Sequence, residues 1–71
     1  MDDESREELR RVLRHDVRTP LAVILGRCEL LSAGLQGPIT PAQASALEAI
    51  ARNATKVTRL LDEALELLQR P

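Results

Sequence analysis

The 71-residue sequence is long enough for at most one small domain, and ten basic against eleven acidic residues leave a net charge of −1, which argues against a nucleic-acid-binding module. The longest apolar run spans five residues, so we expect no membrane segment, and one Cys with one His exclude an internal disulfide and an ordinary structural zinc site. The lone Cys and the lack of a signal-peptide pattern favour a cytoplasmic location.

The first predicted element is a long helix over residues 5–33. Ser5 and Glu8 have the spacing of a capping box, and the acidic residues around them suit the positive end of a helix dipole. Pro20 lies inside this helix. Because proline removes the hydrogen bond to the carbonyl of Asp16, we expect the helix to bend or loosen there.

A loop is predicted over residues 34–40, followed by a second helix over 41–69. No other part of the chain clusters helix breakers in this way: Gly34, Gly37, Pro38 and Pro41. Thr40 and Gln43 have capping-box spacing, and Pro41 fits the first helical position. Gly34 fits the end of the first helix.

The apolar faces predict how the helices associate. Along both helices apolar residues recur in steps of three and four, with an unbroken heptad pattern on the second helix. We expect these residues to form a dimer core: Leu13, Val17, Leu21, Ile24, Cys28, Leu31, Leu47, Ile50, Ala54, Val57, Leu61, Ala64 and Leu68. Further apolar residues flank this seam, so the apolar face is wider than one helix covers. The predicted fold is therefore all-α, an antiparallel helical hairpin that forms a homodimeric four-helix bundle.

The reactive side chains are concentrated in residues 15–21, His-Asp-Val-Arg-Thr-Pro-Leu. His15 is two residues away from an apolar seam position on either side, so its imidazole points toward solvent, and Thr19 lies on the same outer face. Asp16 is within reach of the imidazole. This arrangement fits phosphoryl transfer to the imidazole, with a carboxylate that fixes the ring tautomer and a hydroxyl that positions water. Nearby arginines add a local positive field that favours phosphate.

Residues 15–21 resemble the H-box of the HisKA-type dimerisation and histidine-phosphotransfer domain of sensor histidine kinases, which belong to two-component systems. The Glu-Leu-Leu at 29–31 and the segment 57–65 also resemble the family, and the similarity covers residues 9–69. The resemblance implies one dimerisation and phosphoacceptor domain over residues 1–71. In it, His15 accepts the γ-phosphoryl group of ATP and passes it to an aspartate of a response regulator receiver domain.

The resemblance also assigns roles to the neighbouring residues. Asp16 is implied as the general base or tautomer-fixing group, and Thr19 as the residue that positions water when the regulator is dephosphorylated. Arg18 is implied as an electrostatic group and Pro20 as a helix kink. By position, the regulator is expected to dock on three residues after the H-box: Val23, Gly26 and Arg27.

The sequence departs from the family pattern at Leu9, where Phe is frequent, and at Arg14, where Ser is common. The Asn-rich and Gly-rich boxes of an ATP-binding domain are absent, so we expect a piece of a longer protein that does not autophosphorylate alone. No metal or cofactor is expected on this chain; ATP and Mg²⁺ belong to the separate catalytic domain. The alternatives are a non-catalytic dimerisation scaffold and a coiled-coil adaptor for a partner helix.

Overall fold

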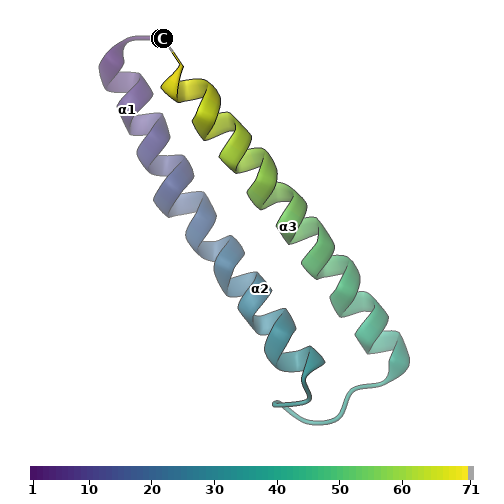
Figure 1. Cartoon of the computed structure of the whole chain (residues 1–71). Coiled ribbons are helices and arrows are strands. Elements are labelled where there is room, and N and C mark those ends of the chain that lie inside the picture. Colours follow the sequence, from purple (N-terminus) through teal and green to yellow (C-terminus); the bar gives the residue numbers. More distant parts are fainter. Residues whose placement is uncertain (71) are drawn as a thin grey trace.

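The computed structural model describes residues 1–70 as an antiparallel helical hairpin (Figure 1). The first arm is continuous and consists of α1 (Asp3–Arg11), the π-helical segment η1 (Val12–Val17) and α2 (Arg18–Ser32). The second arm is α3 (Pro41–Gln69). The arms are joined at one end by the connection over residues 33–40, so α1 lies beside the end of α3 at the opposite tip of the rod (Figure 1).

The first helix begins at Asp3, and the prediction of a Ser5–Glu8 capping box was wrong. Asp2 is the N-cap residue, because its carboxylate accepts the Ser5 backbone N–H at 2.7 Å. A carboxylate is favoured here both as a hydrogen-bond acceptor and by the helix dipole. The hydrogen bond from the Ser5 backbone N–H is the main reason why the pKa of Asp2 lies below its ordinary value, and a hydrogen bond from the Ser5 side chain lowers it further.

The first arm ends in a glycine cap at Gly34, as the sequence predicted. Gly34 has a φ of +76°, a left-handed conformation that glycine adopts without steric cost. The Leu35 backbone N–H donates to the Leu30 carbonyl, and the Gly34 N–H donates to the Leu31 carbonyl, both at 3.1 Å. This pair of bonds is a Schellman motif, and it satisfies carbonyls at the helix end.

The start of α3 confirms the predicted capping box. The Gln43 backbone N–H donates to the Thr40 hydroxyl oxygen at 3.1 Å, and the Thr40 N–H donates to Gln43 Oε1 at 2.8 Å. Pro41 occupies the first helical turn, where its missing N–H leaves no helix bond unmade.

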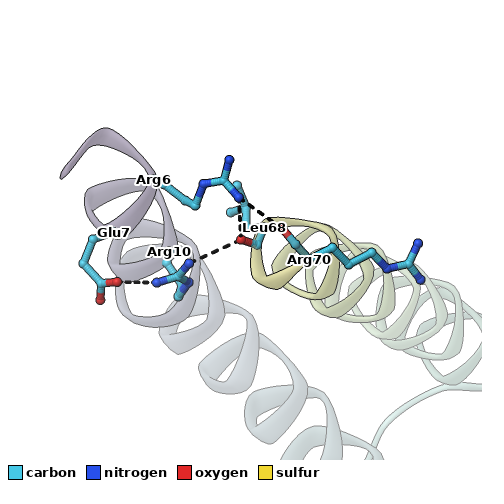
Figure 2. Close-up of polar contacts among 5 residues, drawn as sticks. All are labelled: Arg6, Glu7, Arg10, Leu68 and Arg70. Atoms are coloured by element: carbon cyan, nitrogen blue, oxygen red, sulfur yellow. Dashed lines mark hydrogen bonds and ion pairs between the residues drawn. The ribbon is translucent and has the colours of Figure 1, made fainter. Parts of the chain in front are cut away.

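At the open tip of the hairpin, two arginines of α1 cap the end of α3 (Figure 2). Arg6 donates from Nη1 to the carbonyls of Leu68 at 3.2 Å and Arg70 at 3.3 Å, and Arg10 donates from Nη2 to Leu68 at 3.3 Å. The last carbonyls of a helix lack partners within the helix, and the helix dipole favours cations at that end. These bonds therefore join residues that are about sixty positions apart in the sequence.

The apolar residues of α3 divide into an inner and an outer series. The residues at 47, 54, 61 and 68 face α1, η1 and α2, and Leu61 is only 5% exposed. Ile50 and Val57 lie outside this contact, and Ile50 remains 48% exposed. A further inner series at 44, 51, 58 and 65 flanks the first, and its Thr58 hydroxyl donates to the Ala54 carbonyl at 2.8 Å. The buried Leu65 and the half-buried Leu25 on α2 were absent from the predicted core.

The thirteen predicted core residues accordingly fall into three groups. The buried ones are Cys28, Ala54 and Leu61; the half-buried ones are Leu13, Val17, Leu21, Leu47, Ala64 and Leu68; the exposed ones are Ile24, Leu31, Ile50 and Val57. Ile24 and Leu31 lie one heptad apart on the first arm, and Ile50 and Val57 lie one heptad apart on α3. These four exposed residues therefore form a continuous outer stripe.

The single hairpin is too thin to enclose a large core. It measures 51 × 16 × 12 Å, and its radius of gyration of 16.0 Å exceeds the roughly 11 Å of a compact domain of this length. Within residues 1–70, four apolar side chains are buried: Cys28, Ala54, Leu61 and Leu65. In this part of the chain, none of the helices has the length and apolar character needed to cross a bilayer.

Candidate functional site

His15 lies in the middle of η1, and its side chain is exposed. Its orientation follows from its neighbours: Leu13 and Val17, two residues away on either side, are half-buried against the second arm. A side chain between two inward positions must point outward on a helix. The outward imidazole predicted from the sequence is therefore confirmed.

The helix around His15 is wider than an α-helix. The Arg18 backbone N–H donates to the Leu13 carbonyl, five residues earlier, as in a π-helix. Pro20 accounts for part of this, because its missing N–H and its ring disrupt the preceding turn. The loosening predicted at Pro20 thus takes the form of a π-helical segment.

The spacing of the apolar residues also favours this π-helical segment. Leu9, Leu13, Val17 and Leu21 recur in steps of four, and each such step overshoots an α-helical turn by about 40°. A π-helical turn contains more residues, so it removes part of that drift. The segment keeps Val17 and Leu21 on the inner face while His15 stays outside.

Asp16 and Thr19 are both exposed beside His15. Neither side chain takes part in a hydrogen bond or ion pair among residues 1–70, and no hydrogen bond joins Asp16 to the imidazole. The three polar groups are therefore close along one exposed stretch of helix, and each is free to reorient toward an incoming group.

The arginines near His15 are largely neutralised by acidic partners. Arg10 pairs with Glu7, and Arg11 lies 3.7 Å from Glu8, both within α1. These are ordinary pairs on a helix surface, which reduces the positive field that the composition of this segment suggested. Arg14, next to His15, is exposed and has no ion pair in the described part of the chain.

Arg18 forms an ion pair with Asp62 on α3 that was not predicted from the sequence. The two residues are 44 positions apart, so no local spacing indicates that they meet. Each side chain is about half exposed. The pair links the first residue of α2, directly after η1, to the second arm.

The three residues predicted to bind a partner come together on the outer surface of α2. Val23, Gly26 and Arg27 line one shallow groove, with Leu30 and Leu35 among its other walls. The groove begins two turns after His15, and its lining residues all lie on α2 or in the connection that follows it. Within residues 1–70, no cluster of three or more His, Cys, Asp or Glu side chains could hold a metal ion.

A comparison with models of protein families shows which family the chain belongs to. The family model described as the His Kinase A (phospho-acceptor) domain, HisKA, matches residues 5–70. The chain belongs to the HisKA family. Comparisons with curated proteins and with solved structures gave no match. The match covers nearly the whole hairpin, so both arms and the exposed His15 are parts of one HisKA domain of the histidine kinase class of transferases.

Proposed function

We propose that this HisKA domain is the phosphoacceptor and dimerisation domain of a sensor histidine kinase in which His15 carries the phosphoryl group. A separate ATP-binding domain, with its Mg²⁺, presents ATP, and a receiver domain of a response regulator takes the group from His15. The single observation that carries the proposal is the exposed imidazole on the outer face of a hairpin that belongs to this family. We place the reaction in the cytoplasm, where ATP is available.

The proposed transfer uses the outer ring nitrogen of neutral His15 as the nucleophile. Its lone pair forms the N–P bond to the γ-phosphorus while the bond from phosphorus to the bridging oxygen breaks, and ADP leaves with that electron pair. The ring then carries a positive charge. In the second step, a carboxylate oxygen of the regulator attacks the same phosphorus, and the N–P bond returns its electrons to the imidazole.

Asp16 is the proposed partner of the other ring nitrogen. A carboxylate there accepts the ring N–H, fixes the tautomer and stabilises the positive charge that develops during attack. Asp16 is exposed and has no other partner among residues 1–70, so its carboxylate is free to turn toward the ring. We propose that Thr19 orients the water that attacks the phosphorylated regulator, because its hydroxyl is exposed four residues after His15.

We propose that the regulator docks on the groove formed by Val23, Gly26 and Arg27. This groove offers apolar walls beside one basic side chain and lies on the same arm as His15. A receiver domain seated there places its acceptor aspartate within reach of the phosphohistidine.

We propose that a second copy of the chain covers the outer apolar stripe. Ile24, Leu31, Ile50 and Val57 form this stripe on both arms, and a groove lined by Leu21, Ile24, Ile50 and Val57 runs between α2 and α3. Two hairpins that pack these stripes together make a four-helix bundle and bury the apolar surface that one hairpin leaves in water. The outward His15 faces remain accessible in such a bundle.

Chemical labelling tests the proposed acceptor directly. Incubating the chain with phosphoramidate, a small donor that releases ammonia as the phosphoryl group moves to an imidazole, is expected to give one acid-labile, base-stable phosphoryl group per chain. The matched variant His15→Gln keeps the size and polarity of the side chain and is expected to stay unlabelled. Equal labelling of this variant would assign the group to another residue, and an unlabelled wild-type chain would favour the non-catalytic scaffold.

A further inference from the structure

Arg18 and Asp62 form the one ion pair between the two arms within residues 1–70. The other ion pairs in this part of the chain join residues three or four positions apart. Asp62 directly follows Leu61, which is buried against the first arm. Its carboxylate is therefore anchored at the edge of the packed face and is able to hold a side chain from the opposite arm.

Arg18 is the residue at which the π-helical segment ends. Its backbone N–H closes the wide turn onto the Leu13 carbonyl, and its guanidinium reaches Asp62. The buried apolar side chains on either side of Asp62, Leu61 and Leu65, belong to α3, whereas η1 itself contains no buried residue. The ion pair thus adds a polar restraint at the end of a segment whose own side chains are at most half-buried.

We propose that Asp62 is a positioning residue for the phosphoacceptor, and that it acts through Arg18 by fixing where the π-helical turn ends. The inference rests on the proposed function of His15. His15 lies three residues before Arg18 on the neighbouring surface, and Thr19 follows Arg18 directly, so the anchored residue sets the direction of both. Without the anchor, the wide turn shifts along the helix, and His15 rotates by about 100° when the extra residue of that turn moves past it.

Two neutralising variants of neighbouring acids test this role. Asp62→Asn removes the ion pair, whereas Glu63→Gln removes the same charge one residue later, where no ion pair exists among residues 1–70. For Asp62→Asn we expect shifted amide NMR signals over residues 13–19 and labelling of His15 by phosphoramidate slowed about two- to fivefold, the range expected for a partly exposed pair. For Glu63→Gln we expect neither change.

A charge exchange tests whether the ion pair itself holds the wide turn. The double variant Arg18→Asp with Asp62→Arg restores the pair in reverse, so we expect it to recover the NMR signals over residues 13–19 that each single variant loses. Failure of the exchange to recover these signals, or unchanged signals in Asp62→Asn, overturns the proposal. The NMR signals report on the anchor even when His15 takes no label, so a failed positioning role and a failed phosphoacceptor role give different results.

Discussion

Replacing Ile50 with Ala is expected to weaken self-association without unfolding the hairpin. Ile50 is 48% exposed in one hairpin, and fully burying such a side chain is worth about 1.5–3 kcal/mol. Roughly 1 kcal/mol therefore remains to be gained when a second copy covers it. A twofold dimer contains the residue twice, so the loss is about 2 kcal/mol, which corresponds to a dissociation constant up to ~30-fold higher.

Analytical ultracentrifugation over a range of micromolar concentrations measures this change, and circular dichroism shows whether the helices are kept. Arg52→Ala is the matched control, because it lies about 200° around α3 from Ile50 and is exposed on the outer surface. A wild-type chain that stays monomeric, or an Ile50→Ala variant with an unchanged dissociation constant, would refute the assignment of this stripe to the dimer.

Three further variants test other parts of the structure. Leu61→Ala removes a buried side chain and is expected to lower the free energy of unfolding, measured by chemical denaturation, by about 2–5 kcal/mol. A loss below about 0.5 kcal/mol would contradict the placement of Leu61 in the packed face between the arms. The lowered pKa of Asp2 means that its cap stabilises the fold above the unfolded value of 3.8 and that this stabilisation is lost as the pH falls through the lower folded value. Asp2→Asn should therefore flatten the acid limb of a stability–pH curve, and an unchanged limb argues against the cap. A Cβ added at Gly26 meets no atom within 4 Å, so we expect Gly26→Leu to preserve stability and His15 labelling but to slow transfer to a receiver domain; unchanged transfer would show that the regulator does not dock on this groove.

Short sequence patterns correctly predicted helix caps whose hydrogen bonds join residues close together in the sequence. The capping box at Thr40 and Gln43 and the glycine cap at Gly34 depend on hydrogen bonds within a few residues, so their spacing was enough to predict them. At the first helix, two caps competed, and the earlier Asp2 prevailed over Ser5 because its carboxylate accepts the Ser5 N–H and adds favourable charge.

Contacts between the arms were harder to predict. A heptad pattern shows that a helix has an apolar face, but it does not show whether that face meets the partner arm or a second chain. The face of α3 that packs against the first arm is rotated relative to the predicted seam. It therefore includes Leu65, which is buried, and leaves out Ile50 and Val57, which are exposed. The Arg18–Asp62 pair was missed for the same reason, since it depends on the register between two distant segments.

The outward position of His15 followed from one local argument, its offset from the seam residues on either side. The widening of the helix followed in part from Pro20 and in part from the four-residue steps of the apolar positions, which a regular α-helix accommodates poorly. The direction of the site was therefore predictable, whereas the link that anchors it to α3 was not.

Mapping the phosphoryl group after enzymatic labelling tests the central claim most directly. The chain is incubated with ATP, Mg²⁺ and a separately purified ATP-binding domain of a histidine kinase, and peptides are then analysed by mass spectrometry at neutral pH, where an N–P bond survives. We predict one phosphoryl group, on His15, and none in the folded His15→Gln variant. A phosphoryl group on a Ser, Thr or Asp side chain, or one retained in His15→Gln, would contradict it.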